Sequence, residues 1–187
     1  MATGTRFGDP DVVVAQTVGR PMPGIHLSIL DPNSDGAGEI TVRSPTMMRG
    51  YWQNDEATRA AIDSNGMFHT GDLGRLDDEG NLHLAGRSKE MYIRGGYNVY
   101  PVEIEDILRE HPKVAQVAVI GVPDEVLGER GRAVVVPVSE APTLDELRAW
   151  VRARVADYKA PDELEILQEL PMTAMFKVDK RALAEGL

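Results

Sequence analysis

The sequence predicts an α+β protein, with a β-rich, distorted barrel-like N-terminal part followed by a small α+β domain of the split-βαβ type. Two observations lead to this prediction. In the first half, short segments of alternating apolar and polar residues are separated by turn-forming residues, a pattern typical of strands and hairpins. From residue 91 onward the expected order is β, α, β, β, α, β and a short α, which indicates two helices on one face of a small sheet.

The first half contains a hairpin, a short helix and two further strands. Residues 25–30 and 39–43 alternate around a segment rich in turn formers, which predicts the hairpin. Asn54 is the expected N-cap of a helix that runs to Ile62. Strands at 73–76 and 82–85 flank an acidic turn, 77–80, whose spacing does not match a calcium loop, so we interpret it as a tight turn.

The second half contains clearer helices. Ile104, Ile107 and Leu108 form one apolar stripe on a helix expected at 101–110. Thr143 and Glu146 form a capping box for a helix with apolar residues at helical spacing as far as Val155. The remaining elements are strands at 91–94, 113–122, 133–138 and 164–167, and a last helical turn or two at 179–184.

The composition limits the classes of function. The chain has 187 residues, of which 42% are hydrophobic and 27% charged, as in globular proteins. A net charge of -10 argues against a nucleic-acid surface, and no apolar run approaches the length of a membrane span. The chain has no cysteine and only four scattered histidines, which argues against a protein metal site. The first residues lack the apolar stretch of a signal peptide, so we expect a cytoplasmic protein.

The character of the sequence changes near Arg87. We predict two domains, 1–87 and 88–187, with a hinge near 87–90, because a charged segment flanked by glycine is suited to joining two folded units. Arg87 itself carries a planar guanidinium that suits a diol or a phosphate. A solvated linker would contain the same residues, so this segment alone does not decide the function.

Three other features are candidates for chemistry. Asp72 follows Thr70 and Gly71 at a strand end, where a carboxylate can accept two hydroxyl hydrogen bonds from a ribose-like diol. Taken alone, this motif favours an ordinary turn with a side-chain hydrogen bond. Gly95 and Gly96 permit positive φ and close approach of the backbone, to a ligand or to a neighbouring strand. Lys177 lies on a loop after Pro171, where its amine could reach a phosphate or simply remain in water.

In combination these segments resemble the C-terminal part of an adenylate-forming acyl-CoA synthetase, over about residues 18–181. Several independent motifs occur in register, which makes the resemblance far more specific than any single one. The matching segments are Gly50–Trp52, Phe68–Gly74, Gly86–Glu90, Arg94–Glu105, Gly121–Asp124, Gly128–Glu129, Tyr158–Pro161 and Pro171–Lys180.

The resemblance implies roles for the candidate residues. Asp72 and Arg87 would hold the ribose hydroxyls of ATP or AMP, and Lys89 would be the hinge of a mobile small domain. Gly95 and Gly96 would line the pantetheine path of coenzyme A. Lys177 would be the adenylation lysine, which bridges the substrate carboxylate and the α-phosphate. The family activates a carboxylic acid with ATP and Mg²⁺ and then transfers the acyl group to coenzyme A.

The chain departs from the family in two respects. The family usually has Thr-Gly-Lys at the lysine loop, whereas this chain has Met175-Phe176-Lys177. The loops that grip the triphosphate, adenine and magnesium are not in this sequence, so Mg²⁺ ligands are expected in a remaining N-terminal domain. We therefore expect a C-terminal fragment that is inactive alone, belonging to an enzyme that acts on a carboxylic acid, with a fatty acid as the expected class.

Two alternatives remain open on the sequence. The parent protein could load the phosphopantetheine of a carrier protein instead of free coenzyme A. The chain could instead be a non-catalytic interaction module that keeps the fold. The acyl substrate and the oligomeric state are not determined by these residues.

Overall fold

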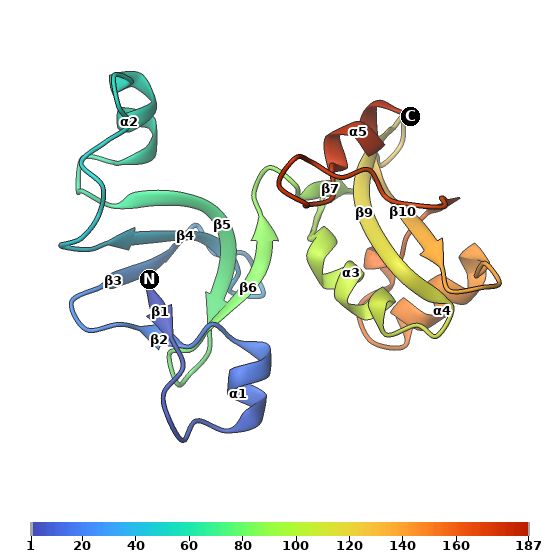
Figure 1. Ribbon diagram of the computed structural model, residues 1–187, viewed down its shortest axis with the longest axis horizontal. Coiled ribbons are helices and arrows are strands. Elements are labelled where there is room, and N and C mark those ends of the chain that lie inside the picture. Colours follow the sequence, from blue (N-terminus) through green and yellow to red (C-terminus); the bar gives the residue numbers. More distant parts are fainter. Residues whose placement is uncertain (1, 187) are drawn as a thin grey trace. The chain divides into compact units, whose positions relative to one another are not determined.

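The computed structural model describes residues 2–186 and divides into two compact units, Met1–Lys89 and Glu90–Leu187 (Figure 1). Each unit combines a sheet with short helices, so the α+β prediction is confirmed. The boundary lies within the predicted joining segment 87–90, whose role as a hinge stays a prediction. No helix among residues 2–186 is long and apolar enough to cross a membrane.

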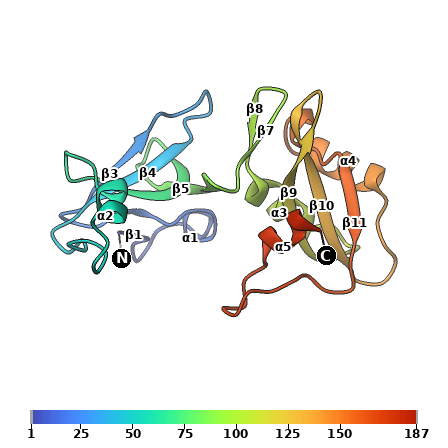
Figure 2. The same cartoon turned by 90° about the horizontal axis from the view of Figure 1, so that it is seen from above.

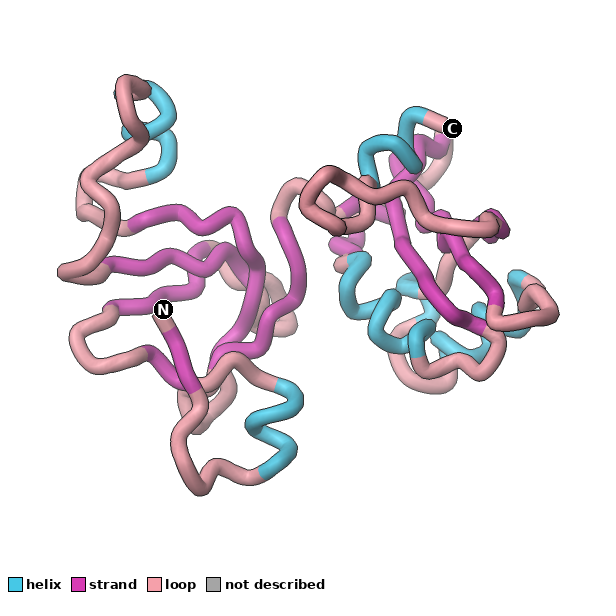
Figure 3. Tube along the Cα trace, viewed as in Figure 1, coloured by secondary structure: helices cyan, strands magenta, loops and turns pink. Residues whose placement is uncertain are grey.

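The first unit is built on a four-stranded antiparallel sheet in the order β3-β4-β5-β6. Consecutive strands pair, and within residues 2–89 the sheet stays open rather than closing into a barrel. Figure 3 shows strands forming the body of this unit. The strands are β3 (His26–Leu30), β4 (Gly38–Arg43), β5 (Phe68–Leu76) and β6 (Leu82–Arg87), with a separate ladder of β1 (Thr3–Gly4) and β2 (Arg20–Pro21).

Several local predictions for the first unit are confirmed. Helix α2 (Asp55–Ala61) starts at Asn54, whose side-chain oxygen accepts the backbone N–H of Ala57 at 2.9 Å. The acidic turn is closed by the carboxylate of Asp77, which accepts the backbone N–H of Asn81 at 2.7 Å. The sequence does not predict helix α1 (Asp11–Gln16), because its run of β-branched valines is a poor helix signal.

The second unit has a mixed sheet in which β10 is the central strand. Along its length β10 pairs antiparallel with β9 and parallel with β11, and its first residue, Gly128, pairs with Arg94 of β7. Figure 2 shows β9, β10 and β11 side by side. The elements are β7 (Tyr92–Arg94), β8 (Tyr97–Val99), α3 (Pro101–Arg109), β9 (Val114–Asp124), β10 (Gly128–Pro137), α4 (Leu144–Arg152), a 3-10 turn (Asp157–Lys159), β11 (Glu163–Ile166) and α5 (Lys180–Glu185).

Both faces of this sheet are covered. Val117 and Val119 of β9 pack with helices α3 and α4 in one buried cluster, which confirms that two helices share a face. Their neighbour Ala118 belongs to a second cluster on the other side, with Leu170 and with Leu183 of α5. The alternation of side chains along a strand explains the two clusters. The C-terminal helix is therefore anchored on the face that α3 and α4 leave open.

The second unit differs from the predictions in several places, and the largest difference is that β10 begins at Gly128 rather than at residue 133. Helix α4 ends at Arg152 rather than near Val155, because the chain continues through a turn before Ala156 adopts an extended conformation. The sequence does not predict strand β8. The glycine pair before it indicates a turn that leads directly into a helix, and β8 has only three residues. The capping box at Thr143 and Glu146 is present as predicted.

Replacing Glu146 with Gln tests the capping box through pH. Hydrogen bonding from the Thr143 backbone and then from Lys113 lowers the pKa of Glu146 from 4.5 to about 2. Because the folded pKa is the lower one, the carboxylate stabilises the fold above pH 4.5, and this contribution is lost as the pH falls toward 2. Glu146→Gln should lower the free energy of unfolding at pH 7 and flatten its decline between these pH values. Urea unfolding with Asp145→Asn as the control measures this, and parallel profiles for Glu146→Gln and wild type would contradict it.

Candidate functional site

Asp72 and Arg87 lie opposite each other on neighbouring strands. They are register partners of β5 and β6, and Arg87 Nε lies 3.0 Å from Asp72 Oδ1. The Asp72 side chain keeps 38% of its surface exposed and the Arg87 side chain 62%. An accessible carboxylate beside an accessible guanidinium can accept and donate hydrogen bonds to the same small ligand, and so fits a ribose diol.

The turn before Asp72 is held by short hydrogen bonds. The Thr70 hydroxyl donates to the carbonyl of Ile40 at 2.7 Å and accepts the backbone N–H of Asp72 at 3.0 Å. The carbonyl of Gly71 accepts the backbone N–H of Ser88 at 3.0 Å. The turn that presents Asp72 is therefore bonded directly to the segment that leads to Lys89.

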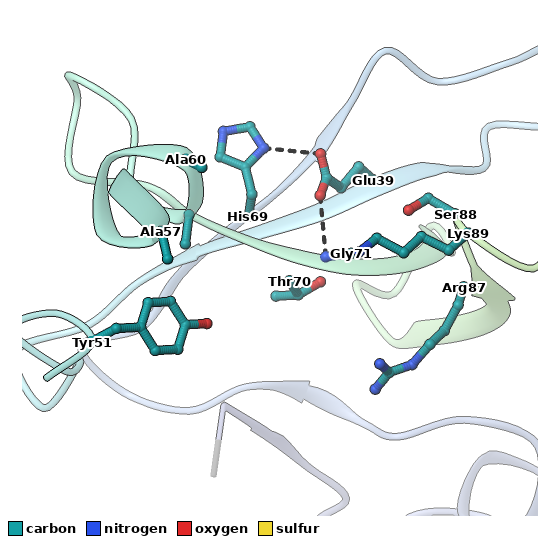
Figure 4. Close-up of a pocket in the computed structure, with 11 residues that line it drawn as sticks. Glu39, Tyr51, Ala57, Ala60, His69, Thr70, Gly71, Arg87, Ser88 and Lys89 are labelled. Atoms are coloured by element: carbon teal, nitrogen blue, oxygen red, sulfur yellow. Dashed lines mark hydrogen bonds and ion pairs between the residues drawn. The ribbon is translucent and has the colours of Figure 1, made fainter. Parts of the chain in front are cut away.

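Glu39 and His69 are site residues that the sequence did not reveal. One carboxylate oxygen of Glu39 lies 2.9 Å from His69 Nδ1, and the other accepts the backbone N–H of Gly71 at 3.1 Å (Figure 4). Both residues lie on strands in which polar and apolar residues alternate, so in the sequence they look like ordinary solvent-facing positions. The sequence feature that could have identified them is the position of His69 within the Phe68–Asp72 motif, three residues before Asp72.

A cavity of about 490 Å³ opens beside this network. Figure 4 shows Glu39, His69 and Tyr51 around it, together with Arg87 and Lys89. The cavity joins the Asp72 turn, the end of β6 and helix α2 on one surface of the first unit. A nucleotide-sized or smaller polar group fits a cavity of this size.

Lys89 is the last residue of the first unit and is exposed. It lines the cavity and immediately precedes Glu90, the first residue of the second unit. An exposed residue at the boundary of two compact units has the location that a hinge requires.

Gly95 and Gly96 form the turn of a hairpin between β7 and β8. Their φ angles are 57° and 86°, and Arg94 pairs with Tyr97 on either side. Two consecutive positive φ angles are typical of a two-residue hairpin turn, so the fold alone requires these glycines. The space beside Gly96 is open, since a Cβ at this position would meet no atom within 4 Å.

The hairpin is fixed to the rest of the second unit by ion pairs. Arg94 Nε lies 2.8 Å from Asp162 Oδ2, and Arg94 Nη2 lies 2.6 Å from Asp162 Oδ1. Burial raises the pKa of Asp162, but hydrogen bonds from Arg94 and from the Gly131 backbone outweigh it and keep the pKa lowered. The backbone N–H of Ile93 donates to the side-chain carboxylate of Glu129 at 2.8 Å. The glycine turn is therefore presented on a rigid support.

Lys177 is exposed near the end of a short hairpin-like loop. The stem is closed by the bridge between Met172 and Val178 and by the Thr173 N–H, which donates to the Lys177 carbonyl at 2.7 Å. Within residues 2–186, the Lys177 ammonium has no hydrogen-bond or ion-pair partner. An ammonium without a protein partner can bind a negatively charged ligand without first breaking an ion pair. The closed stem holds that ammonium near one position.

Phe176, next to Lys177, adopts an unusual backbone conformation. Its φ is 57°, in the left-handed region that a non-glycine residue occupies at a cost of roughly 1–2 kcal/mol. The ring is 88% exposed, so it adds little to the packing of the second unit. The loop therefore keeps the conformation that glycine would adopt, and the difference from the usual glycine is an exposed aromatic ring beside Lys177.

The candidate residues are divided between the two units. Asp72, Arg87 and Lys89 belong to the first unit, whereas the glycine turn at 95–96 and Lys177 belong to the second. Among residues 2–186, no three histidine, aspartate or glutamate side chains gather in a way that would hold a metal ion. The Asp72–Arg87 pair has the donors and acceptors that a ribose diol needs, and the described part of this chain offers no comparable arrangement for Mg²⁺.

Comparisons with known proteins extend over nearly the whole chain. Residues 103–177 match the family model of the AMP-binding enzyme C-terminal domain. The chain is 46% identical, over 99% of its length, to a 7a-methyl-1,5-dioxo-octahydro-1H-inden-4-yl propanoyl:CoA ligase of Mycobacterium tuberculosis, of which it covers 36%. It thus spans about a third of the length of this relative.

Solved structures show the same similarity. The o-succinylbenzoate CoA synthetase of Bacillus subtilis, in complex with its acyl-adenylate intermediate, matches with a TM-score of 0.83 and 32% identity. This match covers 92% of the present chain and 36% of the synthetase. An amide bond synthetase from Marinactinospora thermotolerans matches with a TM-score of 0.80 and 37% identity, over 91% of this chain and 36% of that one.

These matches agree with the motifs in register along the sequence and with the two units of the structure. The similar proteins include CoA ligases, whose names state a carboxylic acid and coenzyme A, and structures with a bound adenylate. In sequence and in fold, the chain corresponds to the C-terminal part of the adenylate-forming acyl-CoA synthetases.

Proposed function

We propose that this chain works as the C-terminal part of an ATP-dependent acyl-CoA synthetase. In the first half-reaction a carboxylate oxygen attacks the α-phosphorus of ATP, and pyrophosphate leaves. In the second, the thiol of coenzyme A attacks the acyl carbon, AMP leaves and the thiol proton is released. The observation that supports this best is that an exposed carboxylate–guanidinium pair and the exposed Lys177 belong to two units that meet after Lys89.

Each half-reaction would use different residues of the second unit. In adenylation, Lys177 would bring positive charge to the α-phosphate and the substrate carboxylate, where negative charge develops. In thioester formation, the glycine turn at Gly95 and Gly96, which is open beside Gly96, would face the pantetheine arm instead. Rotation about Lys89 would exchange the two surfaces, as mobile domains do in enzymes that assemble a site in steps.

The first unit would hold the nucleotide throughout. Asp72 and Arg87 would bind the ribose hydroxyls, and Glu39 would keep the Asp72 turn in place through the Gly71 N–H. Mg²⁺ and the triphosphate would be held by an N-terminal domain, since the family carries those loops there. The cellular compartment we propose is the cytoplasm, and the acid is proposed to be a fatty or similar carboxylic acid.

Lys177→Ala should separate the two half-reactions in the complete enzyme. Loss of a cation that stabilises the transition state should lower the adenylation rate by about 10² or more. ATP–pyrophosphate exchange measures this step, and thioester formation from preformed acyl-adenylate should be nearly unchanged. Equal loss in both half-reactions would refute the role of Lys177.

Asp72→Asn should weaken nucleotide binding. A hydrogen bond to a charged acceptor contributes about 1.5–3 kcal/mol, so the KM for ATP should rise by roughly tenfold or more. Steady-state adenylation at varied ATP measures this rise. Asp78→Asn makes the same substitution at an exposed turn position and should leave KM unchanged. A similar KM for wild type and Asp72→Asn would contradict the assignment.

Phe176→Gly should not destabilise the protein although it removes a large apolar side chain. The ring is 88% exposed, and glycine adopts positive φ without steric cost. We expect the free energy of unfolding to stay within about 1 kcal/mol of wild type. Leu183→Ala, in the buried cluster under α5, should by contrast lose about 2–5 kcal/mol. Chemical denaturation compares them, and a loss at Phe176 as large as that at Leu183 would show that the ring packs against the protein.

A further inference from the structure

Lys180 links the lysine loop to the start of the second unit. It is the first residue of α5 and lies three residues after Lys177. Its ammonium lies 2.8 Å from Glu90 Oε2 and 2.8 Å from Glu105 Oε1. Glu90 directly follows the proposed hinge residue Lys89, and Glu105 belongs to helix α3. One side chain therefore joins the loop, the hinge and the core.

Glu105 makes this link rigid. Its side chain is only 6% exposed, and Oε1 also accepts the buried backbone N–H of Val119 on β9 at 2.8 Å. Arg109 lies 3.4 Å from Oε2. A buried carboxylate with this many partners holds one position, so the Lys180 ammonium is held against a fixed point of the sheet.

The lysine loop is anchored on both sides of its stem. Leu170 before the loop and Leu183 after it belong to the same buried cluster. The Asp179 N–H donates to the Pro171 carbonyl at 2.8 Å, and the Asp179 carboxylate caps α5. These contacts fix the loop within the second unit. The ion pair of Lys180 with Glu90 connects the lysine loop and α5 to the residue that follows the proposed hinge.

We propose that Lys180 is a positioning residue for adenylation, which ties the Lys177 loop to Glu90 so that rotation at Lys89 moves the loop as one rigid body. This inference rests on the proposed function. Without the tie, the second unit would still fold on its two buried clusters, but Glu90 and the lysine loop would move separately. The position of the Lys177 ammonium after rotation would then be less well defined.

Glu90→Gln is the sharpest variant, because it removes the charge at the hinge side and leaves Lys180 paired with the buried Glu105. Displacement of a reacting group by about 1 Å can cost up to 10²-fold in rate, so we expect adenylation in the complete enzyme to slow by about tenfold. The KM values for ATP and the acid should be unchanged. Thioester formation from preformed acyl-adenylate, which does not use Lys177, should keep its wild-type rate.

Lys180→Met and Lys180→Arg complete the series. Lys180→Met should slow adenylation at least as much as Glu90→Gln, and Lys180→Arg should restore part of the rate because it keeps the charge. Arg181→Met is the matched control, since Arg181 is 87% exposed and pairs only with Glu185 among the described residues. It should behave as wild type in both half-reactions. Thermal unfolding of each variant reports whether the fold is kept.

The outcomes distinguish this inference from the proposed function. If Lys177→Ala abolishes adenylation but Glu90→Gln and Lys180→Met do not slow it, the positioning role is wrong and the function stands. The role is also wrong if the variants slow both half-reactions equally, or if Arg181→Met has the same effect. If Lys177→Ala leaves adenylation intact, or the wild-type enzyme performs none, the proposed function fails and this inference fails with it.

Discussion

The function proposed for this chain depends on one covalent constraint: its candidate ligand-binding residues lie in two compact units that are continuous through Lys89. Asp72 and Arg87 are fixed by the β5–β6 ladder, whereas Lys177 and the glycine turn are fixed to a different sheet. A rearrangement within one unit cannot move its candidate residues into the other unit. In the proposed function, the backbone at the boundary would therefore control what the second unit contributes to a reaction at the first.

Such control requires rigidity on both sides of the boundary, and the contacts provide it. Before the boundary, the Ser88 N–H is bonded to the carbonyl of Gly71, next to Asp72. After it, Glu90 is bonded to Lys180, which is held in turn by the buried Glu105. Lys89 is exposed between these two anchors. The proposed rotation at Lys89 would let the small domain present two different surfaces while each unit keeps its own structure.

Much of this organisation could be predicted from the sequence, and the rest could not for identifiable reasons. The capping box at Thr143 and the cap at Asn54 are local signals, and both are confirmed. The pairing of Glu39 with His69 depends on the register of β4 against β5, which bring together residues thirty positions apart. The ion pair of Lys180 with Glu90 likewise joins residues ninety positions apart, and no local pattern encodes it. The left-handed conformation of Phe176 was suggested only by the glycine that the family usually has there.

The distance between the two units of the complete enzyme, in each ligand state, tests the rotation most directly. The chain has no cysteine, so spin labels can be attached at Asp78→Cys and Ser139→Cys, which are exposed positions of the first and second units, once cysteines outside this region are replaced. Pulsed electron paramagnetic resonance should give one distance with ATP and a clearly different one with a stable acyl-adenylate analogue and coenzyme A. Replacing Lys89 with Pro should abolish the change, because proline restricts the backbone rotation. A single distance that is the same in every ligand state would contradict a rotating domain.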